Sequence, residues 1–78
     1  MQQTFFLSID QHKFEFNRLM NPVSYKVSTK DAELPGGIFC VEKDDKGDWQ
    51  LMQQHDLPEW VINIAGNIQE AIVQNEDV

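Results

Sequence analysis

The sequence predicts an α+β domain, with an antiparallel β-meander of about five strands and one C-terminal amphipathic helix packed on one face of the sheet. Two periods support this prediction. As far as residue 54, apolar and polar residues alternate, which is the period of a half-buried strand. After residue 57, apolar residues recur every three or four positions, which is the period of a helix. Because the connections between the strands are short, each strand is expected to pair with the one before it.

Turn residues divide the first part of the chain into the candidate strands. Asp10 to His12 predicts a turn, Asn21-Pro22 breaks the chain, and Pro35-Gly36-Gly37 ends a polar loop. The run from Asp44 to Asp48 predicts a hairpin turn, with Gly47 suited to a left-handed conformation. The whole chain, residues 1–78, is expected to form a single domain. The predicted strands lie near residues 3–9, 12–18, 23–29, 37–43 and 49–54.

We expect the helix near residues 57–74, followed by a frayed tail over residues 75–78. Its start is predicted from Asp56 as the N-cap, Glu59 at the capping-box position and Pro58 in the first turn. The tryptophan of its apolar stripe is expected to be the largest single anchor to the core. The stripe consists of Leu57, Trp60, Val61, Ile64, Ala65, Ile68, Ala71 and Ile72.

The composition is that of a small globular protein, with 78 residues of which 41% are hydrophobic. No apolar run approaches the roughly 20 residues of a membrane span. The first residues lack the basic start of a signal peptide. The single cysteine, Cys40, excludes a disulfide within the chain. We therefore expect a cytoplasmic protein that does not enter a membrane.

The net charge of −7 is distributed unevenly along the chain. All six basic residues precede residue 47, and the following residues contain six acids and no Lys or Arg. This balance disfavours nucleic-acid binding, because Lys and Arg provide the contacts to phosphate. The acids are interpreted as a solvated face that keeps the protein soluble. The alternative is an acidic decoy, which binds a basic protein or imitates nucleic acid.

No motif indicates catalysis or a bound cofactor. His12, Cys40 and His55 share no metal-ligand spacing. The acidic run from Asp44 to Asp48 places Lys46 where a calcium loop needs an oxygen ligand. We therefore expect no enzyme, no catalytic residue, no metal and no cofactor. The alternative is a small enzyme or ligand binder that uses His12, Cys40 or His55.

Two surfaces remain once the core is assigned, because a helix of about 18 residues is about 27 Å long and covers only one face of the sheet. The strand residues expected to face the helix are Phe5, Leu7, Phe14, Phe16, Tyr25, Val27, Phe39, Val41, Trp49 and Leu51. The candidate interaction residues are Phe6, Ile38, Cys40 and Met52 on the other face and Glu59, Ile62, Glu70 and Val73 on the back of the helix. These surfaces predict a non-enzymatic protein–protein interaction module, with a protein partner or with self-association as a homodimer.

Two motifs carry a resemblance to a known type of domain. Gly47-Asp48-Trp49 matches a Gly-x-Trp hairpin, and Leu57-Pro58-Glu59-Trp60-Val61 matches a Leu-Pro-x-Trp-[Ile/Val] helix start. In this order they resemble a small bacterial domain of unknown function, in which a β-meander is closed by a Leu-Pro-x-Trp helix. The resemblance covers the whole chain. It implies a sheet with a C-terminal helix, and it implies no activity and no functional residues.

Overall fold

The computed structural model describes residues 1–20, 22–30, 38–52 and 56–77. The predicted break at Asn21, the loop over residues 31–37 and His55 therefore lie outside the described residues. Within the described ranges, no helix is both long enough and apolar enough to cross a membrane.

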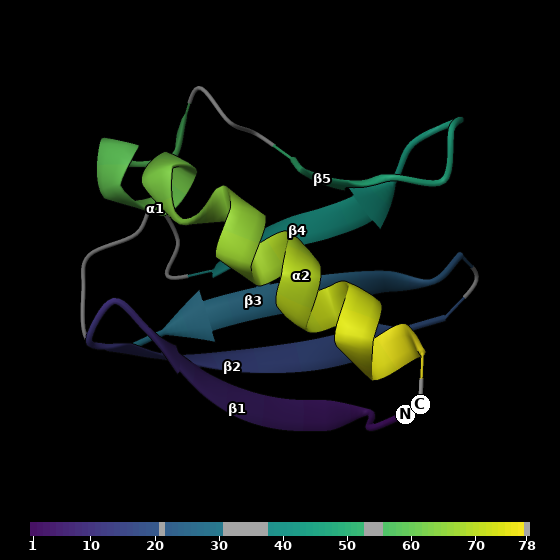
Figure 1. Cartoon of the computed structure of the whole chain (residues 1–78), viewed down its shortest axis with the longest axis horizontal. Coiled ribbons are helices and arrows are strands. Elements are labelled where there is room, and N and C mark those ends of the chain that lie inside the picture. The colour runs from purple at the N-terminus through teal and green to yellow at the C-terminus, as the bar shows by residue number, and fades with distance from the viewer. Residues whose placement is uncertain (21, 31–37, 53–55, 78) are drawn as a thin grey trace.

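The structure confirms the predicted fold class. Five strands form one antiparallel sheet in the order β1-β2-β3-β4-β5, and the C-terminal helices pack against one of its faces (Figure 1). Each of the first four strands begins and ends within one residue of its predicted position. The fifth strand ends at Leu51, so its predicted extension to Met52 is wrong, and residues 53–54 lie outside the described part. The strands are β1 (Thr4–Ile9), β2 (His12–Leu19), β3 (Ser24–Thr29), β4 (Ile38–Lys43) and β5 (Trp49–Leu51).

Both described hairpin turns depend on residues with positive φ. Asp10 (φ 52°) and Gln11 (φ 69°) connect β1 to β2 in the manner of a type I′ turn, although neither is glycine. His12, which the turn was predicted to include, is already the first residue of β2. The second turn uses Gly47 (φ 85°), as predicted, and the Asp44 side chain accepts the backbone N–H of Lys46 at 2.9 Å.

The predicted single helix near residues 57–74 is wrong, because the chain forms α1 (Glu59–Asn63) and α2 (Ala65–Glu76), separated at Ile64. Ile64 has φ −104° and ψ 11°, and its N–H bonds to the carbonyl three residues earlier, as in a 3₁₀ turn. This tightened turn gives α1 and α2 different directions (Figure 1).

The predicted N-cap is wrong as well. The helix begins after Pro58 (φ −60°, ψ 152°), and Asp56 does not cap it. A helix capped by Asp56 would need Leu57 in the helical conformation. The proline ring disfavours that conformation for the residue that precedes it, so the chain stays extended until Pro58.

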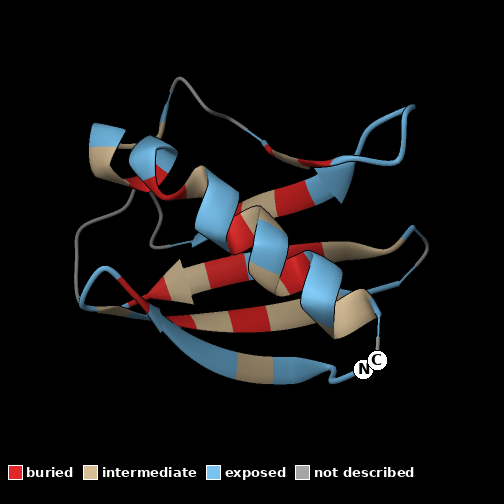
Figure 2. Cartoon of the chain, viewed as in Figure 1, coloured by how far each residue is buried: buried red, intermediate tan, exposed pale blue. Residues whose placement is uncertain are grey.

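The core lies between α2 and the middle of the sheet, where Figure 2 shows the buried segments of β2, β3 and β4 facing the helix. The strand residues on this face are those expected from the alternation, but burial falls toward β1. Phe5 is half-buried, stacked on Phe16 at 4.6 Å between ring centroids, and Leu7 remains 40% exposed. The buried apolar residues are Ile9, Phe14, Phe16, Tyr25, Val27, Phe39, Val41, Trp49, Leu51, Val61, Ile64, Ile68 and Ile72.

Trp60 is not the largest anchor of the core. Its ring is half-buried and lies against His12, 4.4 Å away between centroids, and against Phe14 at 6.1 Å. Its half-burial follows from its place on α1, which lies toward one end of the sheet (Figure 1). The largest fully buried side chains are instead the strand residues Tyr25, Phe14, Phe16 and Phe39.

Candidate interaction surfaces

A polar cluster ties the end of α2 to the sheet. Glu76 accepts hydrogen bonds from Arg18 Nε at 2.7 Å, from Arg18 Nη2 at 3.3 Å and from the Tyr25 hydroxyl. The side chains of this ion pair are only 7% and 19% exposed for Arg18 and Glu76. Asn75 donates to the same Tyr25 hydroxyl at 2.8 Å. The predicted frayed tail is therefore wrong for residues 75 and 76, which the sheet holds in place.

The cluster perturbs the protonation of its members in a consistent way. The hydrogen bond from Arg18 lowers the pKa of Glu76 below its ordinary value, and the same bond raises the pKa of Arg18. Burial raises the pKa of Tyr25, and the hydrogen bond to Glu76 adds to this effect. Because the charges compensate each other inside one structural contact, the cluster fixes the position of α2 and offers no free acid or base.

The uncovered face of the sheet divides its apolar residues between two sides. The strand register places Phe6 opposite Glu15, Glu15 opposite Ser28, and Ser28 opposite Ile38. Two polar residues thus separate Phe6 on β1 from Ile38 on β4. Phe6 is 57% exposed. The four candidate sheet residues therefore do not form one patch.

Three of the four lie together at the β4–β5 side. Ile38 and Cys40 are two residues apart on one strand, and the N–H of Met52 donates to the Cys40 carbonyl at 2.9 Å. Ile38 and Met52 are 40% and 39% exposed, and Cys40 is half-buried with a free thiol. This is a small apolar region, flanked across the strand by Lys26.

The candidate residues on the back of the helices are exposed but point in different directions. Glu70 lies beside β1, where it lines a groove of about 300 Å³ with Leu7. Val73 lies on the other flank of α2, in a groove beside β5. Ile62 is 38% exposed and Glu59 is exposed, both on the short helix α1. The structure does not bring these residues together into one site.

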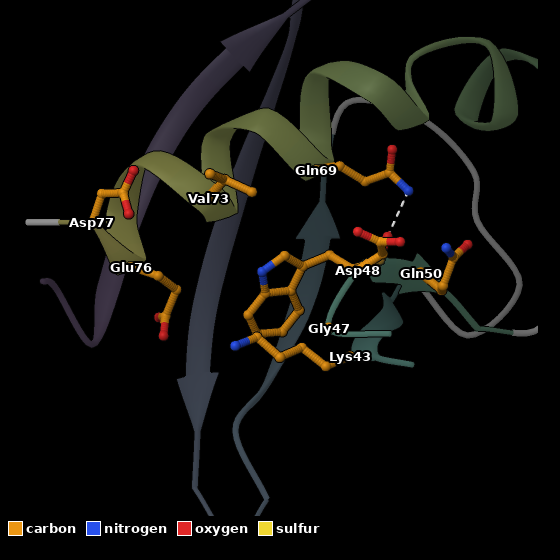
Figure 3. A pocket seen from close by; sticks show the side chains of 9 residues that line it. Lys43, Gly47, Asp48, Gln50, Gln69, Val73, Glu76 and Asp77 are labelled. Atoms are coloured by element: carbon orange, nitrogen blue, oxygen red, sulfur yellow. Dashed lines mark hydrogen bonds between the residues drawn. The ribbon is translucent and has the colours of Figure 1, made fainter. Parts of the chain in front are cut away.

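The groove beside β5 has a volume of about 480 Å³ and lies between the β4–β5 hairpin and α2 (Figure 3). Two of its charged groups, Lys43 and Glu76, already interact with neighbours within the protein. Lys43 Nζ lies 5.3 Å from the centroid of the Trp49 ring, and Glu76 belongs to the ion pair with Arg18. Gln69 donates to the Trp49 carbonyl oxygen at 2.6 Å. The lining residues are Lys43, Gly47, Asp48, Trp49, Gln50, Gln69, Val73, Glu76 and Asp77.

The residues considered for catalysis lie apart. His12 alternates in phase with Phe14 and faces the helices, where its ring contacts Trp60 and is half-buried rather than solvated. Cys40 lies on the opposite face of the sheet, in phase with Ile38. Within the described ranges, no three His, Cys, Asp or Glu side chains gather where a metal ion would bind.

The two edge strands differ in how their outer sides are covered. β5 has only three residues, and α2 covers it through the Gln69 bond to Trp49. β1 has six residues, Thr4–Ile9, and pairs with β2 in an uninterrupted register. It contains no charged residue and no proline, which are the usual protection of an exposed edge. Figure 2 shows most of its length exposed.

The β1 edge is the feature that the residue pattern did not single out. The one available signal was the run Gln2 to Ile9, which has no charge in a chain of net charge −7. Comparison of the chain with protein-family models, with curated proteins and with solved structures finds no match.

Proposed function

We propose that the protein is a non-enzymatic protein–protein interaction module, whose contact surface is the side of the sheet that includes β1 and the uncovered face around Phe6. The single observation that supports this most directly is the exposure of Phe6, at 57%, on β1, which is an edge strand of the sheet. Leu7 on the other face of the same strand is 40% exposed. Adjacent large apolar side chains beside free backbone groups are typical of a surface that pairs with another chain.

The arrangement of polar groups around Phe6 suits a protein contact. Thr4 donates through its hydroxyl to Asn17 Oδ1 at 2.9 Å, and Asn17 donates to Glu15 at 2.7 Å. Lys13 Nζ lies 5.3 Å from the centroid of the Phe6 ring. An apolar centre with an ordered polar border is the usual composition of a protein interface.

The acidic alternative receives less support. A decoy needs its acids aligned in a row, but Glu70 lies beside β1 while Asp48 and Asp77 line the groove beside β5. Glu76 is compensated by Arg18. An enzyme or ligand binder receives less support as well, because His12 and Cys40 lie on opposite faces of the sheet. We place the protein in the cytoplasm, since its free Cys40 suits a reducing compartment.

The experiment compares proteins captured by the tagged full chain with those captured by Phe6→Lys, using quantitative mass spectrometry together with light scattering of the purified chain. Val73→Lys is the matched control, because Val73 is 45% exposed and lies on the far flank of α2. We expect Phe6→Lys to lose association, with another protein or with itself, that Val73→Lys retains. The proposal is refuted if the wild-type chain does not self-associate and captures no protein that Phe6→Lys fails to capture.

A further inference from the structure

The backbone of β1 directs a defined set of hydrogen-bonding groups toward solvent. The N–H of Arg18 donates to the Gln3 carbonyl at 2.7 Å, which fixes the phase of the β1–β2 ladder. In an antiparallel pair, successive residues direct their backbone groups alternately toward the partner strand and away from it. The strand residues that direct N–H and C=O away from β2 are therefore Thr4, Phe6 and Ser8.

The end of this free edge is defined by α2. Gln2 has the same phase, but its N–H donates to Asn75 Oδ1 at 2.9 Å and its carbonyl accepts Asn75 Nδ2 at 3.0 Å. The Asn75 side chain on α2 therefore occupies the outward N–H and C=O of Gln2. At the other end, the strand stops at the turn that begins with Asp10. Within the described chain, the free edge comprises the three outward residues Thr4, Phe6 and Ser8.

We propose that this edge pairs with the β1 edge of a second copy of the chain, antiparallel and about a two-fold axis at Phe6; the inference rests on the proposed interaction function. In this register Thr4 of one copy lies opposite Ser8 of the other, and Phe6 lies opposite Phe6. It is the only antiparallel register in which the three free residues of each copy pair among themselves. The two sheets join into one continuous sheet.

The side chains fit the same register. On the uncovered face the two Phe6 rings become direct cross-strand neighbours, and on the helix face Leu7 of each copy lies beside Phe5 of the other. The exposed apolar residues of β1 thus cover one another. Because residues 2–9 carry no charged side chain, a second copy approaches along the part of the surface where the net charge of −7 opposes it least.

The association stops at two copies because the second edge is covered. A chain of subunits would need β1 of one copy to pair with β5 of another. Gln69 occupies the Trp49 carbonyl on β5, and that strand has only three residues. A two-fold β1–β1 contact uses both available edges and closes the assembly. Strand pairing alone gives an interface at the small end of the known range, so the dimer is expected to dissociate on dilution.

Single cysteines introduced on the edge test the register in full-length chains whose native cysteine is replaced by Cys40→Ser. Opposed residues in such a pair have Cα atoms about 5.5 Å apart, which a disulfide spans. In a mixture of Thr4→Cys and Ser8→Cys chains, we expect oxidation to link one chain of each kind through a disulfide. Both variants keep the Phe6 side chain at the centre of the contact. Neither variant is expected to link to itself, because four residues along a strand separate those positions by about 13 Å. Equal linking of the single variants overturns the proposed register.

Light scattering from about 10 µM to about 1 mM, the range where weak dimers dissociate, provides the second measurement. We expect the wild-type mass to rise toward two chains and Ser8→Pro to stay a monomer, since proline removes only an outward N–H. Ile38→Lys is the control, because Ile38 lies on the uncovered face away from β1.

The other outcomes distinguish a failure of the β1–β1 dimer from a failure of the proposed interaction function. A dimer that persists in Ser8→Pro but is lost in Ile38→Lys overturns the edge contact, while an interaction module acting through the sheet face remains. A strictly monomeric wild-type chain overturns the second copy as the partner. If that monomer still captures a different protein that Phe6→Lys does not, the proposed function stands.

Discussion

Replacing Glu76 by glutamine should destabilise the protein and remove part of its acid sensitivity. The substitution keeps the size of the side chain but removes the charge that accepts hydrogen bonds from Arg18 and Tyr25. These contacts join the end of α2 to β2 and β3. The change therefore tests whether the polar cluster, rather than the apolar stripe alone, holds the helix end on the sheet.

The expected loss in the free energy of unfolding is about 1–2 kcal/mol. A hydrogen bond to a charged group contributes about 1.5–3 kcal/mol and a neutral one about 0.5–1.5 kcal/mol, so each well-formed contact loses roughly 1 kcal/mol. The position of Glu76 in the last turn of α2 offsets part of this loss, because a negative charge there opposes the helix dipole by about 0.3–1 kcal/mol. In a domain of this size, the change lowers the melting temperature by roughly 4–16 °C.

The pH dependence supplies an independent check. Because Arg18 lowers the pKa of Glu76 in the folded state, the ionised carboxylate stabilises the fold above its ordinary pKa near 4.5. This contribution is lost as the pH falls through the lowered value. The difference in stability between the wild type and Glu76→Gln should thus be largest near neutral pH and should shrink in acid.

Urea denaturation followed by far-UV circular dichroism, at several pH values from neutral to acid, measures this difference. Glu70→Gln is the matched control, since Glu70 is exposed on the same helix and accepts a long, exposed hydrogen bond from the neighbouring Gln74 at 3.4 Å. If Glu76→Gln is as stable as Glu70→Gln at neutral pH, or if the difference between them does not shrink in acid, the reasoning is refuted.

Three further substitutions test the core and the turns. Ile68→Ala removes a fully buried side chain beneath α2 and should lower the unfolding free energy by about 2–5 kcal/mol in urea denaturation, whereas a loss below about 1 kcal/mol contradicts the packing. Gln11→Gly relieves a positive φ of 69° and should raise the melting temperature; an unchanged or lower value speaks against strain there. Gly47→Ala introduces strain at φ 85°, and a calorimetric melting temperature equal to the wild type would show that the turn adapts.

The sequence by itself determined the strands, the glycine turn and the face of the sheet that forms the core. Alternation along β2 and β3 determines which residues face the core, because neighbouring side chains of a strand point to opposite faces whatever lies beyond them. Gly47 predicts a turn for an equally local reason, since few other residues adopt a positive φ without strain. The cap at Asp56 was predicted incorrectly by applying a local rule without the restriction that Pro58 imposes on Leu57.

Only the tertiary structure decided which surfaces are left for function. Arg18 and Glu76 are 58 residues apart in the chain, and no local pattern shows that they meet. The division of Phe6 from Ile38 depends on the register of β1, β2, β3 and β4 together. The free edge of β1 depends on how far α2 reaches across the sheet. Period and turn chemistry act between neighbours, whereas the reach of a helix and the exposure of an edge result from packing across the whole chain.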